Sequence, residues 1–95
     1  MRKYRFVWDD NKHESNFNKH GISFEEAATV FKDPNYVEIY DEEHSLEESR
    51  FMVIGFSENM RVLTVCHCYR DDGNIIRIIS ARKATKGEIK IYGGA

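Results

Sequence analysis

The N-terminal part of the chain combines a short segment of alternating apolar and polar positions with a longer helical segment. Residues 4–8 alternate weakly and carry β-prone side chains, so they predict a short strand. Asp9 or Asp10 is suited to cap a helix over roughly 10–20, and Gly21 is typical of the residue that follows a helix. The sequence therefore predicts a strand followed directly by a helix.

A second helix is predicted to begin after Ser23. Ser23 and Glu26 have the spacing of a capping box, in which each side chain accepts a hydrogen bond from the other residue's backbone N–H. The helix should stop before Pro34, which cannot continue it. Its apolar side chains fall on one face and comprise Phe24, Ala27, Ala28 and Phe31.

After Pro34 the spacing changes to the period of two that is typical of strands. Four strands are predicted, over residues 36–40, 50–57, 61–70 and 75–82. Short turns join the last three, including an Asp-Gly turn within 71–74, so these strands should form an antiparallel meander. Residues 86–92 fit either a short helix, which a capping box at Thr85 would begin, or a further strand. The predicted fold class is α+β, with two N-terminal helices packed on a mainly antiparallel β-sheet.

Composition narrows the class of protein. A chain of 95 residues with 41% hydrophobic and 13% aromatic side chains suits one folded domain over residues 1–95. No apolar run approaches the roughly 20 residues that cross a bilayer, so no membrane association is expected. Two cysteines are too few for a disulfide scaffold, which favours the reducing cytoplasm as the location.

The charges are separated along the chain. The formal net charge of -2 argues by itself against a nucleic-acid partner, because proteins that bind nucleic acids are usually basic. Residues 1–24 carry a net charge of +2, residues 25–49 carry -8 and residues 50–95 carry +4. A folded chain can collect each sign on a separate surface, so the mean charge excludes little.

Cys66, His67 and Cys68 are the first candidates for a chemical site. Neighbouring side chains of a strand point to opposite faces, so the two cysteines should face one way and His67 the other. The spacing is not that of a zinc site, and no second cysteine pair exists. We therefore predict no metal site and interpret the cysteines as small buried residues of a central strand.

Arginines in the predicted strands are the second group of candidates. Arg77 has the parity of Ile75, whereas Arg82 has the parity of Ile76 and Ile78, which places the two guanidinium groups on opposite faces. A charge among isoleucines is costly unless it is paired or faces a polar cleft. Both a salt bridge to the acidic segment and a clamp on a phosphate would satisfy it.

Two histidines are candidates for acid–base chemistry, because an imidazole titrates near neutral pH. His20 follows Lys19 at the end of the first predicted helix, where the helix dipole also stabilises cations. His44 lies in the acidic stretch 41–48, where a solvated loop residue is the alternative interpretation. Tyr92, near the C-terminus, fits either a docking anchor or a phenolic proton carrier.

Taken together, these residues resemble the BrnT family of toxins from bacterial type II toxin–antitoxin modules. The resemblance runs almost from end to end. Its first half rests on Trp8-Asp9, Lys12, Asn16, Lys19-His20-Gly21-Ile22, Phe24-Glu25-Glu26-Ala27, Phe31 and Asp33-Pro34. Its second half rests on His44, Glu48-Ser49-Arg50, Gly55, Leu63 and Val65, Arg70, Ile76-Arg77-Ile78-Ile79-Ser80-Ala81-Arg82-Lys83-Ala84, Glu88 and Tyr92.

The resemblance implies a compact α+β fold similar to RelE-type toxins. It also implies an endoribonuclease that cleaves RNA without a metal or other cofactor and so inhibits translation and growth. Residue type and resemblance together suggest the catalytic residues Arg82, His20, His44 and Arg70. They suggest as substrate-binding residues Lys19, Arg50, Arg77 and Tyr92.

A partner protein is implied as well. The resemblance predicts a hetero-oligomer with a BrnA-like antitoxin, which would bind the acidic 25–49 region and the sheet face. DNA would be contacted only indirectly, through that antitoxin. The alternative function is a non-catalytic interaction module that binds the antitoxin and takes part in repression of its own operon.

Overall fold

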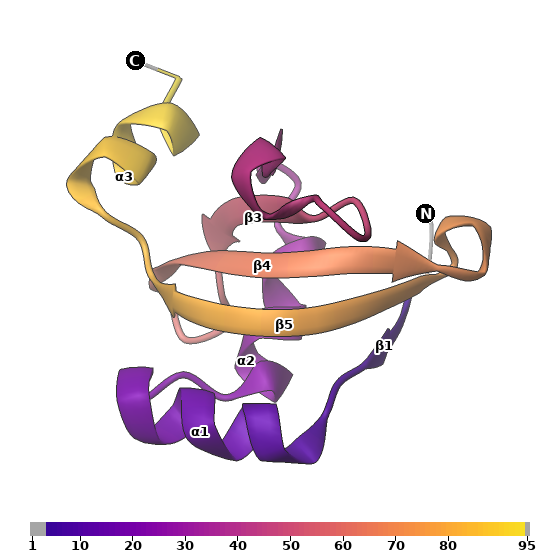
Figure 1. Ribbon diagram of the computed structural model, residues 1–95. Coiled ribbons are helices and arrows are strands. Elements are labelled where there is room, and N and C mark those ends of the chain that lie inside the picture. Colours follow the sequence, from indigo (N-terminus) through magenta and orange to yellow (C-terminus); the bar gives the residue numbers. More distant parts are fainter. Residues whose placement is uncertain (1–3, 95) are drawn as a thin grey trace.

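One five-stranded sheet organises the chain, with two helices on one of its faces and a third helix beyond the opposite face (Figure 1). The computed structural model describes residues 4–94. Its helices are α1 (Asp10–His20), α2 (Phe24–Thr29) and α3 (Lys86–Tyr92). Its strands are β1 (Arg5–Val7), β2 (Val37–Tyr40), β3 (Phe51–Phe56), β4 (Val62–Arg70) and β5 (Ile75–Lys83). The predicted α+β class is confirmed.

The strands lie in the order β1-β5-β4-β3-β2. The last three strands in the chain form the predicted antiparallel meander, and β2 pairs antiparallel with β3. Only β1 is parallel to its neighbour, and it covers no more than the first three residues of β5, Ile75 to Arg77. The rest of that edge of β5 is therefore left for α1, which Figure 1 shows directly beneath the strand.

The ends of α1 follow from two local signals. The side chain of Asp9 accepts a hydrogen bond from the backbone N–H of Lys12 at 3.0 Å and so caps the first turn. Gly21 has a φ of 70°, a left-handed conformation that glycine adopts without strain, and its N–H donates to the carbonyl of Phe17 at 2.8 Å. Both predicted ends of the helix are confirmed.

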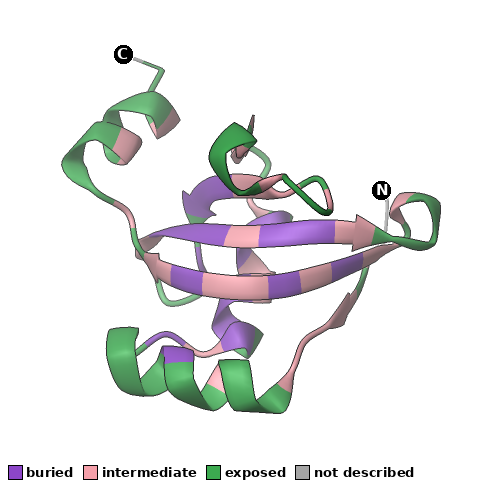
Figure 2. Cartoon of the chain, viewed as in Figure 1, coloured by how far each residue is buried: buried purple, intermediate pink, exposed green. Residues whose placement is uncertain are grey.

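The core lies between α2 and the sheet face that α1 and α2 cover (Figure 2). Alternate residues of the central strands point into it, because successive side chains of a strand face opposite sides. The apolar residues of this core that are at most 1% exposed are Ile22, Phe24, Ala27, Val30, Val53, Leu63, Val65, Ile76, Ile78 and Ala81. His67 is also fully buried on this side, between Phe31 and Phe51.

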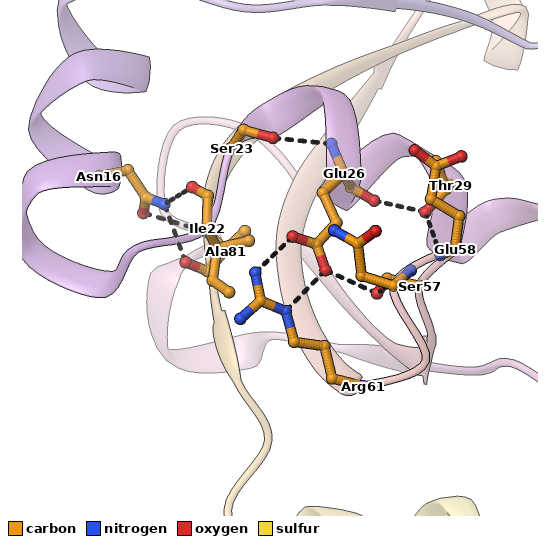
Figure 3. A network of polar contacts seen from close by, with 10 residues as sticks. Asn16, Ile22, Ser23, Glu26, Thr29, Ser57, Glu58, Arg61 and Ala81 are labelled. Atoms are coloured by element: carbon orange, nitrogen blue, oxygen red, sulfur yellow. Dashed lines mark hydrogen bonds and ion pairs between the residues drawn. The ribbon is translucent and has the colours of Figure 1, made fainter.

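The N-terminus of α2 uses only half of the predicted capping box. The hydroxyl of Ser23 accepts the backbone N–H of Glu26 at 3.0 Å, as expected. The carboxylate of Glu26 does not return to the helix cap but receives Arg61 at 2.6 and 2.8 Å and the hydroxyl of Ser57 at 2.6 Å (Figure 3). A buried carboxylate is better stabilised by a guanidinium than by one amide, which explains the difference.

Asn16 connects α1 to the free edge of β5. Its amide group donates to the carbonyl of Ala81 at 2.9 Å and accepts the N–H of the same residue at 3.1 Å (Figure 3). It also donates to the carbonyl of Ile22 at 3.1 Å, at the turn between α1 and α2. The side chain thus satisfies backbone groups that a neighbouring strand would otherwise pair.

A bulge in β5 changes which arginines share a face. The pairing between β4 and β5 slips by one residue in the middle of the strands, which leaves Ile79 as an extra residue. Beyond Ile79 it is Ala81, and not Arg82, that points into the core. Arg82 therefore lies on the same face as Arg77. The prediction of opposite faces is wrong, because one extra residue inverts the alternation for the rest of the strand.

Residues 86–92 form helix α3, which decides between the two alternatives for this segment. Here the capping box is complete: Thr85 accepts the N–H of Glu88 at 3.2 Å, and Glu88 accepts the N–H of Thr85 at 2.8 Å. None of the helices within residues 4–94 is long and apolar enough to cross a membrane.

The Glu26–Arg61 pair predicts a pH dependence of stability. Hydrogen bonds from Arg61 lower the pKa of Glu26 from 4.5 to about 2 in the folded protein. A carboxyl group whose pKa is lower in the folded state stabilises it above the unfolded pKa, and this stabilisation is lost as the pH falls towards 2. We expect Glu26→Gln to lower the free energy of unfolding at pH 7 by about 2 kcal/mol. Urea unfolding should show the difference from wild type shrinking between pH 4.5 and 2, and a constant difference would contradict the ion pair.

Candidate active site

The sheet face that points away from α1 and α2 carries a cavity of about 300 Å³. We call this surface the open face. The pairs Thr64–Arg82 and Cys66–Ser80 stand opposite one another on β4 and β5, so four side chains of neighbouring strands meet there. The loop before β3 closes one side. The polar residues that line the cavity are Asp41, His44, Arg50, Thr64, Ser80 and Arg82.

Arg82 is held in the cavity by Glu88 of α3. Two nitrogens of its guanidinium donate to the two carboxylate oxygens of Glu88, at 2.7 and 3.0 Å. The same carboxylate accepts the hydroxyl of Thr64 at 2.8 Å. Hydrogen bonds from Arg82 lower the pKa of Glu88 to about 2, so the pair stays ionised at neutral pH. Nη1 also donates to the carbonyl of Lys83 at 3.4 Å, so this geometry fixes the guanidinium and leaves Nε and one N–H of Nη2 without a partner within residues 4–94.

His44 is paired with Asp41 in a short turn of 3-10 helix, Glu42–His44. Its Nδ1 lies 3.0 and 3.2 Å from the two carboxylate oxygens of Asp41. A carboxylate on Nδ1 favours the tautomer that carries its proton there and leaves Nε2 as an acceptor. The backbone N–H of Asp41 donates to the carbonyl of Arg50 at 2.8 Å, which closes the loop and brings both residues to the cavity.

The two cysteines follow the predicted parity. They lie on the open face, whereas His67 lies in the core. Cys66 contributes to the wall of the cavity, and burial raises the pKa of its thiol, which therefore stays neutral. Cys68 is buried, and its sulfur accepts a hydrogen bond from Arg70 at 3.2 Å. Within residues 4–94 no group of three or more histidine, cysteine or acidic side chains is placed to hold a metal ion.

The structure places only some of the residues that the sequence suggested for the site in the cavity. His44, Arg50 and Arg82 line the cavity together. Arg70 lies towards the opposite ends of β4 and β5, where its guanidinium donates to Glu48 at 2.8 Å. Arg77 faces the same side of the sheet near Arg70, and within the described part of the chain its side chain has no hydrogen bond or ion pair.

Lys19, His20 and Tyr92 lie outside the cavity. Lys19 and His20 end α1 and line a separate hollow beside β5. The hydroxyl of Tyr92 donates to Asp33 at 2.6 Å, and its ring packs against Phe56. Of the two interpretations of Tyr92, the docking anchor is the one that these contacts support.

Sequence reasoning missed three polar residues that line the cavity, Asp41, Thr64 and Ser80, and also Glu88, which holds Arg82 there without lining it. Thr64 and Ser80 are small polar residues in strands and carry no signal of their own. Glu88 was assigned only to a capping box, although the same carboxylate also binds Arg82. Asp41 stands three residues before His44 in the sequence, and this spacing within a helical turn is the signal that was present.

Comparison with known proteins identifies the family. The model of one protein family matches residues 8–88, and the family is described as the ribonuclease toxin BrnT of type II toxin–antitoxin systems. The chain belongs to the BrnT family. A solved structure, the crystal structure of the Brucella abortus ribonuclease toxin BrnT, has a similar fold, with a TM-score of 0.68 over 88% of this chain and 100% of that chain. The two sequences are 20% identical, and no curated protein sequence matches this chain.

Membership of a type II toxin family implies an antitoxin partner and an RNA substrate. In the acidic segment that is predicted to bind the antitoxin, some carboxylates have partners within the protein and others do not. Its carboxylates on Glu26, Asp33, Glu38 and Glu48 are bonded to Arg61, Tyr92, His67 and Arg70. Its unpaired part, within the described residues, is the loop around Leu46, which is 95% exposed and flanked by Glu42, Glu43 and Glu47.

The contact between Tyr92 and Asp33 predicts that Tyr92 anchors α3. Hydrogen bonding to Asp33 raises the pKa of Tyr92 to about 12, so the phenol holds its proton at neutral pH. We expect Tyr92→Phe to increase hydrogen exchange of the α3 amides roughly tenfold and to leave RNA cleavage unchanged, because one hydrogen bond is removed and the ring stays on Phe56. Loss of cleavage with unchanged exchange would instead make Tyr92 a proton carrier.

Proposed function

We propose that this chain is the toxin of a type II module and an endoribonuclease whose reaction takes place in the cavity of the open face. One observation carries the proposal: the cavity combines two guanidinium groups, on Arg50 and Arg82, with an imidazole that Asp41 orients. Guanidinium groups suit a phosphodiester because they donate in pairs to its oxygens. An imidazole with a free nitrogen suits proton transfer near neutral pH.

The reaction is an attack of the ribose 2′-oxygen on the neighbouring phosphorus. His44 accepts the proton of the 2′-hydroxyl on Nε2 as the bond from the 2′-oxygen to phosphorus forms. Arg50 and Arg82 stabilise the additional negative charge on the phosphorane. The bond from phosphorus to the 5′-oxygen then breaks, the leaving oxygen takes a proton from water, and a 2′,3′-cyclic phosphate remains. The hydroxide formed from that water takes the proton from His44, which restores the neutral imidazole. None of these steps requires a metal ion.

Glu88 is a positioning residue in this proposal. It holds the guanidinium of Arg82 from one side, and Thr64 and the capping box of α3 hold Glu88 in turn. Arg77 has no partner of its own within the described residues and would contact RNA that continues along β5. Arg70 does not line the cavity, so we assign it no contact with the reacting phosphate.

The antitoxin-binding surface is proposed to be the acidic loop of residues 42–47. An antitoxin of the BrnA kind would place a basic surface against Glu42, Glu43 and Glu47 and an apolar pocket over Leu46. The loop also carries His44, so a partner bound there would cover the mouth of the cavity. Contacts with DNA would come from the antitoxin.

Arg82 gives the first test of this function. We expect Arg82→Ala to lower kcat/KM for RNA cleavage, measured in EDTA, by a factor of about 100 to 1,000, because one charged donor to the transition state is removed. Arg82→Lys should recover only part of the activity, since an amine lacks paired donors. Arg5→Ala is the matched control, because Arg5 is exposed in β1 and does not line the cavity.

Two outcomes would overturn the assignment. A folded Arg82→Ala protein that cleaves RNA at the wild-type rate removes Arg82 from the reaction. A wild-type protein that binds its antitoxin but never cleaves RNA would instead support the alternative function, a non-catalytic interaction module.

The two histidines give the second test. His44→Ala should lower kcat by a factor of about 100 to 10,000, the range for removal of a general base. His20→Ala is the matched control and should keep kcat, because His20 does not line the cavity. Single-turnover cleavage with each variant separates the two, and a loss confined to His20→Ala would move the base to the end of α1.

A further inference from the structure

A second hollow, of about 360 Å³, lies between α1 and the edge of β5. Lys12, Lys19 and His20 line it from the helix, and Ser80 lines it from the strand. None of the described residues that line it is acidic, and neither lysine side chain forms an ion pair within residues 4–94. The hollow itself therefore carries positive charge, and the acidic residue on the adjoining surface of α1, Glu14, lies beside Lys19 but outside the hollow.

The hollow and the cavity of the open face share two residues, Ile79 and Ser80. Both lie at the bulge of β5, where no strand of residues 4–94 pairs with its outer side, since β1 pairs only as far as Arg77. The edge of the strand is therefore the boundary between the two spaces. A bound polymer that leaves the cavity past Ser80 therefore enters the hollow directly.

We propose that RNA crosses the β5 edge at Ser80 and that the hollow binds phosphates that flank the cleavage site. The proposal rests on RNA cleavage in the cavity and adds a binding site outside it. Lys12 and Lys19 are seven residues apart, which places them on one face of α1, about 10 Å apart along the helix axis. At that separation the two ammonium groups meet different phosphates of one strand.

The chemistry of the hollow fits a phosphodiester chain better than a folded protein partner. Hydrogen-bonding side chains line it, with Ser15 and Asn11 beside the lysines. Lysine binds phosphate as a flexible point charge without requiring a fixed orientation, which suits contacts that do not select a base. Binding of this kind should therefore depend on RNA length and on salt, and little on sequence.

The test is binding of a 2′-O-methyl RNA oligonucleotide of twelve residues, which lacks the attacking hydroxyl, followed by fluorescence anisotropy. We expect the Lys12→Ala/Lys19→Ala protein to bind about tenfold more weakly than wild type at low salt. The slope of log K against log salt should be less steep by about 1.4, because each phosphate of a single strand that a lysine no longer neutralises reduces it by about 0.7. A three-residue oligonucleotide, which fills only the cavity, should bind both proteins equally.

Arg5→Ala/Lys32→Ala is the matched control, because it removes the same charge from exposed residues that line neither space. An unchanged affinity and salt slope in the Lys12→Ala/Lys19→Ala protein would overturn the proposal, and so would an equal weakening in the control. The readout is binding and not cleavage. A wild-type protein that binds the longer RNA through these lysines but cleaves nothing would contradict the proposed reaction and leave this site standing.

Discussion

The placement of α1 against the sheet depends on the side chain of Asn16. It is the buried residue of that helix, and it bonds both backbone groups of Ala81 in the way a neighbouring strand would. Its removal would leave buried backbone groups unsatisfied, at a cost of about 1–3 kcal/mol each. Because β1 ends at the start of β5, this contact holds the helix along the remaining edge. The hollow with Lys12 and Lys19 exists only because α1 stands there.

Much of the fold was predictable because its signals are local. The cap at Asp9, the left-handed Gly21 and the capping box at Thr85 each depend on residues within one turn of chain. The errors came from interactions between distant segments. The carboxylate of Glu26 does not cap α2 as predicted but binds Arg61, which is 35 residues away in the sequence. No residue type in the sequence indicates the bulge at Ile79. The bulge nevertheless decides the face of the sheet on which every later residue of β5 lies.

The candidate site shows the same division. Residue type pointed to His44, Arg50 and Arg82, and the fold brings these three to one cavity. It gave no indication that Arg70 and Tyr92 are bonded to carboxylates elsewhere, since a charge or a phenol looks the same in the sequence whether it is paired or free. The net charge of the acidic segment misled in the same way. Two of its carboxylates, on Glu26 and Glu48, neutralise arginines of the chain itself, and those on Asp33 and Glu38 accept hydrogen bonds from Tyr92 and Tyr69.

The capping box of α3 links the folding of this helix to the electrostatic potential of the cavity. The carboxylate of Glu88 that begins the helix is the one that neutralises Arg82. If the last turns unwind, the cap opens and the negative charge leaves the cavity in the same event. The potential that an incoming anion meets is thus set by the helix–coil balance of the seven residues of α3, which include no buried side chain.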